Sequence, residues 1–245
     1  MNSSALKVVS WNLNGLSEEQ RDPRTEAALT EILLGIPMKK LLAGASPKTP
    51  PDVVMLQEVV ARTYHAHLRP HLRAAGFSIF PEEPPQRSYF EVIAVRDRPI
   101  LEAHSRPFAD SALGRYLTTV RIEQLTLMTA HLESLKSGSA DRISQASHIL
   151  WRLGSTPRSL FLGDTNLRES EWSALHSDGI TDAWVAAGSD PSQKSTWGHR
   201  GAACRFDRAW SHGLRVRSFG LLGTTFVEGL GQPPSDHRGI CVQVA

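Results

Sequence analysis

The sequence contains only two cysteines, Cys204 and Cys241, among its 245 residues. Two cysteines cannot build the disulfide framework of a small secreted domain, so we expect a reduced, intracellular protein. No apolar run reaches the roughly 18–20 residues that a membrane-spanning helix needs. The first ten residues carry no basic start followed by an apolar stretch, so we expect neither a secretory signal nor a membrane partner.

The sequence also has little excess charge of either sign. The 27 lysines and arginines are nearly balanced by 25 aspartates and glutamates, which leaves a net charge of +2. This balance excludes a strongly basic coat protein of nucleic acids, but it allows an enzyme that binds a few phosphates in one cleft. Hydrophobic residues make up 40% of the chain and charged residues 21%. That composition excludes a disordered or fibrous protein and suffices for one sizeable core.

Several catalytic signatures are missing. The sequence has no HExxH or CxxC spacing, no GxSxG elbow, no P-loop and no dinucleotide-binding fingerprint. These absences argue against a zinc protease, a serine hydrolase, a P-loop nucleotide hydrolase and a dehydrogenase.

Short apolar runs rich in β-branched residues recur along the chain and predict strands, with helix-like stretches between them. The predicted helices cover residues 25–35, about 61–75 and 139–154. The predicted strands cover residues 6–13, 52–60, 89–96, 115–123, 125–132, 159–166, 214–222 and 239–244. Interleaved strands and helices indicate an α/β fold with mixed sheets. Because we find no linker and no internal repeat, we expect one domain over residues 1–245.

Polar side chains gather where the predicted strands begin or end. One asparagine, aspartate or serine at such a place more often starts a turn or caps a helix. Six strand ends with carboxylate, amide or imidazole groups instead predict a site, because ligands bind at strand ends in α/β sheets. The residues concerned are Asn12, Asn14, Gln57, Glu58, His131, Glu133, Ser134, Asp164, Asn166, Asp207, Asp236 and His237.

This set is dominated by oxygen donors, and no cysteine belongs to it. Carboxylate and amide oxygens suit Mg²⁺ or Mn²⁺, which proteins usually hold with one or two carboxylates and substrate phosphate. Cleavage of a phosphate ester by a metal-assisted water therefore fits the set better than acyl or hydride transfer.

Six motifs, in this order, resemble those of the endonuclease/exonuclease/phosphatase superfamily. They are SWNLNGL (10–16), LQEV (56–59), TAHLES (129–134), GDTNLRE (163–169), RFDR (205–208) and SDHRG (235–239). The resemblance runs from about Val8 to Val244. It implies a DNase I-like fold, a four-layer α/β sandwich in which two packed mixed sheets are flanked by helices.

Finer features are similar to the tyrosyl-DNA phosphodiesterase 2 branch of this superfamily. They are the residues from Asp141 after HLES, the extended GDTNLRE and the pair Thr196-Trp197 ahead of RFDR. The chain departs from that branch at Asn14 and Gly198, where an aspartate is usual, and at Arg238, where a tryptophan is usual. The resemblance implies a DNA-repair phosphodiesterase that cleaves 5′-phosphotyrosyl bonds and leaves a 5′-phosphate.

Two alternatives stay open. One is another DNase I-like phosphodiesterase, such as an abasic-site endonuclease, a nuclease or an enzyme of small-molecule phosphodiesters. The other is a catalytically inactive DNA-binding relative, which is less favoured because all expected metal and base positions are filled.

The resemblance also implies a role for each motif residue. Glu58 and Asp236 would hold Mg²⁺ or Mn²⁺, and Asp164 would orient and deprotonate the attacking water. The remaining catalytic assignments are Asn166 as an amide donor, His131 and His237 as stabilisers of charge on the phosphorus, and Asp207 as the carboxylate that keeps His237 protonated.

The substrate-binding assignments are Asn12, Ser134, Arg168 and Trp197. Arg168 over the Trp197 indole could gain about 0.5–2 kcal/mol by cation–π attraction. Arg115, Arg142 and Arg205 are candidates for buried or groove-facing arginines. Because the sequence shows no aromatic ladder, we expect the partner to be a short DNA 5′ end with a tyrosyl or peptide adduct, bound by a monomer.

Overall fold

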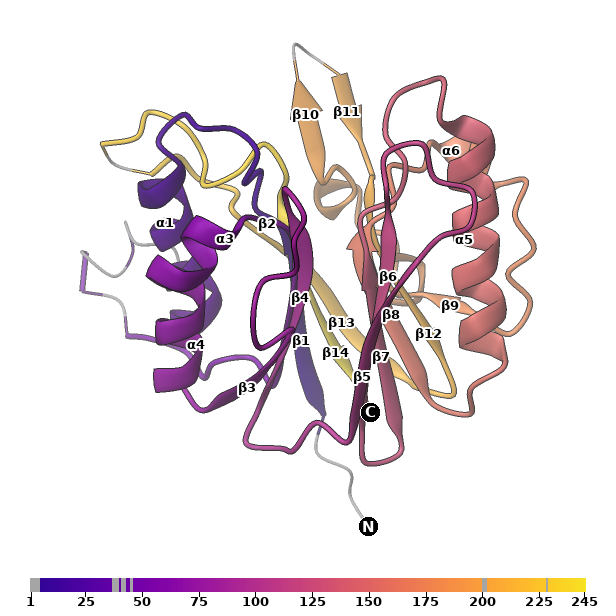
Figure 1. The fold of residues 1–245 in the computed structure, drawn as a ribbon, viewed down its shortest axis with the longest axis horizontal. Helices are drawn as coiled ribbons and strands as arrows, with labels where there is room; N and C mark the ends of the chain where they lie inside the picture. The colour runs from indigo at the N-terminus through magenta and orange to yellow at the C-terminus, as the bar shows by residue number, and fades with distance from the viewer. Residues whose placement is uncertain (1–4, 37–39, 41–42, 45, 200–201, 228) are drawn as a thin grey trace.

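The computed structural model describes residues 5–36, 40, 43–44, 46–199, 202–227 and 229–245. Two six-stranded sheets pack face to face, and helices cover their outer faces (Figure 1). The strand order is β13-β14-β1-β2-β4-β3 in the first sheet and β5-β6-β7-β8-β12-β9 in the second. Both sheets are mixed, because β1 and β2 pair in parallel, as do β7 and β8, among otherwise antiparallel neighbours. The predicted four-layer sandwich is confirmed.

The first sheet contains most of the strands that the apolar runs predicted near the two ends of the chain. Its strands are β1 (Leu6–Asn12), β2 (Val53–Val59), β3 (Phe77–Phe80), β4 (Phe90–Arg96), β13 (Val216–Leu222) and β14 (Gly239–Val244). The second sheet is built from the middle of the chain. Its strands are β5 (Glu102–Pro107), β6 (Tyr116–Ile122), β7 (Leu125–Ala130), β8 (Ser159–Asp164), β9 (Thr181–Asp182) and β12 (Asp207–His212).

Two groups of helices form the outer layers. On the first sheet lie α1 (Arg21–Leu34), α3 (Ala61–Thr63) and α4 (Arg69–Ala74), the last two joined by a π-helical turn at Tyr64–Leu68. Helix α1 begins four residues earlier than predicted, because Pro23 falls in its first turn, where a missing N–H costs nothing. Helix α5 (Ser139–Gly154) covers the second sheet and has the predicted bounds. Two short helices, α6 (Glu169–Trp172) and α7 (Ala183–Ala186), and the 3₁₀ turn η2 (Pro191–Gln193) follow it.

Three apolar clusters fill the spaces between the layers. The middle cluster joins the facing sides of the two sheets, and the outer two join each sheet to its helices. A fully buried aliphatic side chain contributes roughly 1.5–3 kcal/mol, so these clusters supply the main driving force for folding. None of the helices in the described part of the chain is long and apolar enough to cross a membrane.

Trp11 fixes the contact between β1 and β14. Its indole is fully buried, and its Nε1 donates a hydrogen bond to the carbonyl oxygen of His237 at 2.9 Å. A Cβ atom added to Gly239 would lie 2.8 Å from Cδ2 of this indole, so only glycine fits there. Trp11, which precedes Asn12, thus positions the loop that carries the last motif, SDHRG (235–239).

The sequence patterns did not predict several of the strands. Edge strand β5 shows no clear alternation of burial, and β12 is interrupted by the polar residues Arg208 and Ser211, both buried. Asp207, which we expected at the end of a strand, instead begins β12. Strands β10 (Trp197–His199) and β11 (Ala202–Cys204) form a separate hairpin at the upper edge of the molecule in Figure 1.

Candidate active site

The register of the strands brings the motif residues to one edge of the sandwich. Asn12 ends β1 and lies opposite Gln57 of the parallel strand β2, which places Glu58 at the same level. In the second sheet, Asp164 ends β8 and pairs with Asp207, the first residue of the antiparallel strand β12. Strand β8 therefore ends where β12 begins, and Asp164 and Asp207 lie side by side.

Asp164 is the centre of this arrangement, and its side chain is 1% exposed. Its Oδ2 lies 2.9 Å from Nδ2 of Asn12, 3.3 Å from Nε2 of His131 and 3.6 Å from Nε2 of His237. Its Oδ1 accepts a hydrogen bond from the backbone N–H of Asn166 at 3.0 Å. Burial raises the pKa of Asp164, against the opposing effect of the charged His237. A carboxylate with a raised pKa is a stronger base for water.

His237 forms a hydrogen-bonded pair with Asp207. Nδ1 of the imidazole lies 2.9 Å from Oδ2 of Asp207, and both side chains are buried. Burial alone would lower the pKa of His237, but the carboxylates of Asp207 and Asp164 raise it to about 10. The imidazole is therefore positively charged at neutral pH, with Nε2–H directed at Asp164.

His131 is the electrostatic opposite of His237. Burial and the adjacent charges of Arg115 and His237 hold its pKa well below the usual value, so the imidazole is neutral. Nη1 of Arg115 lies 2.9 Å from Nδ1. Because a guanidinium can only donate, Nδ1 must accept and Nε2 must carry the proton. Burial is the main cause of this neutral state, and the positive charge of Arg115 adds to it.

Glu58 is held by an irregular backbone. Its φ angle is 52°, in the left-handed region, and the pairing of β2 with β4 shifts between Leu56 and Val59. Such strain costs about 1–3 kcal/mol and persists only where the surroundings impose it. The carbonyl oxygen of Glu58 would lie 2.0 Å from a Cβ on Gly15, so glycine in the first motif permits this contact. Oε1 of Glu58 accepts a hydrogen bond from Asn12 at 3.1 Å.

Two separate groups of side chains could hold a metal ion. Asp164, Asp207 and His237 each offer one ligand atom, and these atoms lie within 4.8 Å of one another. Nδ1 of His237 is held by Asp207 at 2.9 Å, so only its Nε2 could serve a metal ion. The other group is Glu58 with Asp236. Burial raises the pKa of Glu58, and the charges of Asp164 and Asp236 add to the effect, as expected where carboxylates gather.

Asp236 is exposed and lies beside the β10–β11 hairpin. Its Oδ2 accepts a hydrogen bond from Nε1 of Trp197 at 3.1 Å. Ser235, the preceding residue, donates from Oγ to the carbonyl oxygen of Asn12 at 2.7 Å. The first and last motifs are thereby tied to each other, although more than 220 residues separate them along the chain.

The other predicted substrate contacts lie around the same edge. Oγ of Ser134 is 3.4 Å from Nη2 of Arg115. Nδ2 of Asn166 donates to the carbonyl oxygen of Leu132 at 3.3 Å, which turns its amide toward the 131–134 segment. The guanidinium of Arg168 lies 5.9 Å from the centre of the Phe206 ring, and this ring lies 5.3 Å from the nearer ring of Trp197. A direct contact between Arg168 and Trp197 stays a prediction.

Two of the candidate arginines have structural partners. Arg142 is fully buried and binds Glu171 through Nε at 3.0 Å and Nη2 at 2.5 Å. Arg205 binds both carboxylate oxygens of Asp182, at 2.9 and 3.0 Å. Arg115, in contrast, contacts His131 directly and so belongs to the site.

Three residues of the site were not found by sequence reasoning. The hydroxyl of Tyr89 accepts a hydrogen bond from Arg115, and its ring lies 6.0 Å from that of His131. Oγ1 of Thr196 accepts hydrogen bonds from the backbone N–H groups of Phe206 and Asp207, at 3.1 and 2.9 Å. The only signal for Thr196 was its place before Trp197, and none pointed to Tyr89.

Arg24 was the third residue missed. It is 3% exposed, and its guanidinium donates hydrogen bonds only to backbone carbonyl oxygens, so no pairing of residue types reveals it. The acceptors are Leu13, Asn14, Ser17, Glu19 and Pro234, at 2.9–3.2 Å. The arginine thus joins the loop after Asn12 to the loop before Asp236.

Comparison with known proteins places this geometry in a family. The sequence model of the endonuclease/exonuclease/phosphatase family matches residues 9–237. Human tyrosyl-DNA phosphodiesterase 2 is 28% identical over 98% of this chain and 68% of its own length. The 5′-tyrosyl-DNA phosphodiesterase of Caenorhabditis briggsae is 30% identical over 96% of this chain and 68% of its own.

Solved structures agree with the sequence matches. The crystal structure of Danio rerio tyrosyl-DNA phosphodiesterase 2 with a single-strand DNA product has a TM-score of 0.82 and 27% identity, over 99% of this chain and all of that one. The Caenorhabditis elegans enzyme has the same TM-score and 28% identity, over 98% of this chain and 75% of its own. The family match covers the first five motifs in full and ends at His237 within the sixth, and the side chains of Asn12, Glu58, His131, Asp164, Asp207 and His237 meet at one edge. The chain therefore belongs to the endonuclease/exonuclease/phosphatase family and is a phosphodiesterase hydrolase.

Proposed function

We propose that the chain is a Mg²⁺- or Mn²⁺-dependent phosphodiesterase that hydrolyses 5′-phosphotyrosyl bonds of protein–DNA adducts and leaves a 5′-phosphate. The observation that carries the proposal is the convergence of three nitrogen donors on Oδ2 of Asp164. The substrate class comes from the relatives named tyrosyl-DNA phosphodiesterase and from the Danio rerio structure with its DNA product.

Asp164 has the environment of a general base. It accepts a proton from the attacking water at Oδ2, while Asn12 and the backbone N–H of Asn166 hold the carboxylate in place. The water oxygen forms a bond to phosphorus, and the bond from phosphorus to the tyrosyl oxygen breaks in line with it. The tyrosine leaves with its phenolic oxygen, and the DNA keeps a 5′-phosphate.

The two histidines act in different charge states. His237 donates from Nε2 to a phosphoryl oxygen as an imidazolium, because Asp207 holds its Nδ1 proton. His131 donates from Nε2 as a neutral imidazole, because Arg115 occupies its Nδ1. Donors that are already in place stabilise the charge that develops on these oxygens without reorganisation.

The donor set fits a hard divalent cation. Glu58 and Asp236 offer carboxylate oxygens, Asn12 lies against Glu58, and the negative charges of Asp164 and Asp236 add to burial in raising the pKa of Glu58. A bound Mg²⁺ or Mn²⁺ would supply positive charge next to the phosphoryl oxygens. In a thermal denaturation series, Mg²⁺ is expected to raise the melting temperature of the wild type and to raise it less in Glu58→Gln. An equal increase in both proteins would refute Glu58 as a ligand.

The substrate assignment is tested with a panel. Release of tyrosine from a 5′-phosphotyrosyl oligonucleotide is measured against nicking of an abasic duplex, digestion of an unmodified strand and hydrolysis of a small chromogenic phosphodiester. We expect the first to have the highest kcat/KM, to stop with EDTA and to recover with Mg²⁺ or Mn²⁺. Preference for another substrate would identify a different phosphodiesterase of the same family, and binding without turnover would identify an inactive relative.

The cellular setting belongs to the same proposal. We infer a DNA-repair enzyme that acts inside the cell as one catalytic domain of residues 1–245. Both cysteines, Cys204 and Cys241, are free thiols, as a reducing compartment keeps them. That the protein acts as a monomer stays a prediction, which light scattering checks.

A further inference from the structure

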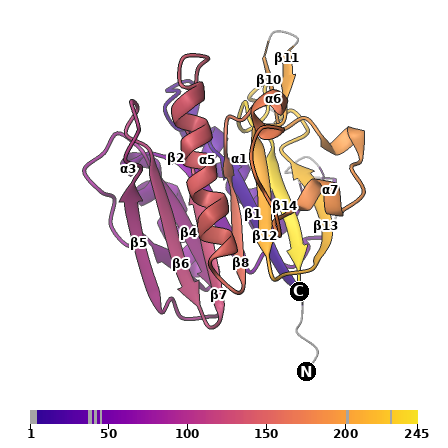
Figure 2. The same cartoon turned by 90° about the vertical axis from the view of Figure 1, so that its right-hand side faces the viewer.

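A cavity of about 260 Å³ lies between edge strand β5 and helix α5. Figure 2 shows α5 crossing the outer face of the second sheet, with β5 and β6 beside it. None of the residues that we assign to catalysis or to the metal lines this cavity. Its walls come from β5, β6, the loop at residues 108–110 and one face of α5.

Four basic or titratable side chains line the cavity. His104 and Arg106 alternate along β5 with Ala103, which packs into the core between the sheets, so both lie on the face that α5 covers. His148 and Arg152 are four residues apart on α5 and therefore share one helix face. Strand and helix thus each contribute one arginine and one histidine.

No carboxylate in the described part of the chain forms an ion pair with either of these arginines. Glu102, which shares their row on β5, is bound by Arg121 at 2.6 Å. Asp110 is the one described carboxylate in the lining, and it makes no ion pair. Arg106 and Arg152 therefore bring two positive charges to the cavity without an ion-pair partner among the described carboxylates.

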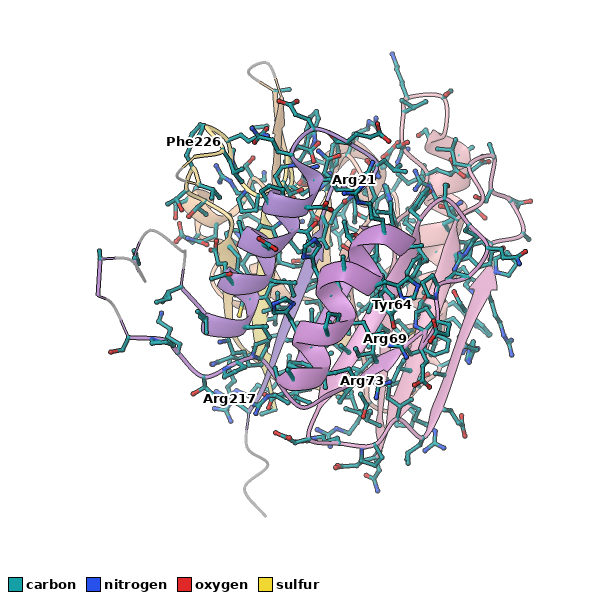
Figure 3. The ribbon with its side chains drawn as sticks, turned by 60° about the vertical axis from the view of Figure 1, so that its left-hand side comes forward. Arg21, Tyr64, Arg69, Arg73, Arg217 and Phe226 are labelled. Carbon is teal, nitrogen blue, oxygen red and sulfur yellow. The ribbon has the colours of Figure 1, made fainter. Side chains whose placement is uncertain are left out.

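Arginines on the opposite face of the molecule behave differently. On α4, Arg69 and Arg73 point along the surface, as Figure 3 shows. They pair with Glu83 at 2.6 Å and Glu82 at 2.8 Å. Each of these α4 arginines thus has a glutamate partner, whereas the two arginines of the β5–α5 cavity have none among the described carboxylates.

The pKa values of the two histidines are affected by the same positive charges. Burial lowers the pKa of His104, and Arg106 and Arg152 lower it further against the opposing charge of Glu102. Burial and Arg152 likewise lower the pKa of His148. An anion between these groups would reverse the electrostatic part of both shifts, because it favours the protonated imidazole.

We propose that the β5–α5 cavity binds a phosphate group, held by Arg106 and Arg152 with His104 and His148 as further donors. Arginine is suited to this task, because its planar guanidinium matches two phosphate oxygens at once. The phosphate belongs either to the backbone of a bound DNA strand or to a free phosphate or small phosphorylated molecule.

The cavity is connected to the catalytic edge. Nε2 of Gln145, in the lining, donates to the carbonyl oxygen of Asp110 at 3.1 Å, and its Oε1 accepts from the backbone N–H of Glu133 at 3.0 Å. Glu133 in turn accepts from Ser111 and from the N–H of Leu113, at 2.7 and 3.0 Å. A phosphate in the cavity thus lies against the loop that supports His131 and Ser134.

The test is a histidine-resolved NMR titration of the full chain in EDTA, with inorganic phosphate in one arm and a 5′-phosphorylated single strand in the other. The signals are assigned with His104→Asn and His148→Asn. We expect inorganic phosphate to raise the pKa of both histidines, and Arg152→Gln to weaken its binding roughly tenfold or more, as loss of one charged hydrogen bond does. Arg73→Gln on α4 is the matched control and should bind as the wild type does.

The two arms separate the two sources. If the oligonucleotide acts at lower concentration than inorganic phosphate, and the double variant Arg106→Gln/Arg152→Gln raises KM for DNA with unchanged kcat, the ligand is the DNA backbone. If inorganic phosphate alone acts, it is a small anion. The proposal is overturned if neither probe moves His104 and His148, or if the response survives in the double variant. The NMR titrations measure binding and not turnover, so a negative result in them is distinct from failure of the proposed activity.

Discussion

Two clusters of buried charge meet at the segment of residues 131–135, and they follow opposite rules. In the clamp of Arg142 and Glu171, the buried guanidinium binds both carboxylate oxygens, and Arg168 approaches the same carboxylate at 3.9 Å. Nη1 of Arg142 also donates to three carbonyl oxygens of this segment. In the catalytic cluster, the carboxylates of Glu58, Asp164 and Asp207 face a single charged imidazole, that of His237.

The difference separates stability from function. A buried pair in which every donor and acceptor is satisfied holds a segment in place. A surplus of carboxylates does not. Burial is the main cause of the raised pKa values of Glu58 and Asp164, and the neighbouring carboxylates add to it. Such a surplus persists where a positively charged ligand or a transition state is stabilised by it. Removing a charge from the clamp should therefore lower stability, whereas removing one from the catalytic cluster should lower activity.

The largest expected effect is on the catalytic cluster. Asp164→Asn should lower kcat by roughly 10²–10⁴-fold, because an amide cannot take the proton of the attacking water. Its free energy of unfolding should stay equal to that of the wild type or rise, since the variant removes a buried charge. Steady-state kinetics and urea denaturation measure the two quantities. A variant that keeps its turnover would exclude Asp164 as the base.

The next effect is on the clamp. Arg142→Met should lower the free energy of unfolding by about 3–5 kcal/mol, because it removes the two-pronged partner of the buried Glu171 carboxylate. Arg69→Met breaks the exposed pair with Glu83 and should cost only about 0–1 kcal/mol. Urea denaturation compares the two variants. Equal losses would show that the clamp is no more important to stability than a surface ion pair.

The smallest effect is a pH dependence of the clamp. Burial alone would raise the pKa of Glu171, but hydrogen bonds from Arg142, Ser139 and the N–H of Arg168 lower it to about 2, from 4.5. The stabilisation is therefore present above pH 4.5 and is lost as the pH falls from 4.5 through 2. The difference in stability between wild type and Glu171→Gln should shrink over this window. A constant difference would place the titration elsewhere.

The sequence predicted the fold and the motif residues because both rest on local patterns. Apolar runs marked the central strands, and the polar residues after them marked Asn12, Glu58 and Asp164. Edge strand β5 was missed because its two faces are alike in burial. Arg24 was missed because it binds backbone carbonyl oxygens, one of them that of Pro234. Every residue has such an oxygen, so no pair of residue types in the sequence points to the contact. The neutral state of His131 comes from burial and from Arg115, a neighbour that the pairing of β6 with β7 brings to it.

The buried indole of Trp11 constrains how this protein can diverge or be redesigned. Two glycines from the other end of the chain leave room for it, since a Cβ on Gly223 would lie 2.3 Å from its Cζ2 and one on Gly239 2.8 Å from its Cδ2. Its Nε1 also holds the carbonyl oxygen of His237. Enlarging either glycine alone would displace the ring and the histidine with it. Mutagenesis libraries should therefore vary positions 11, 223 and 239 together, because scanning them one at a time would miss the compatible combinations.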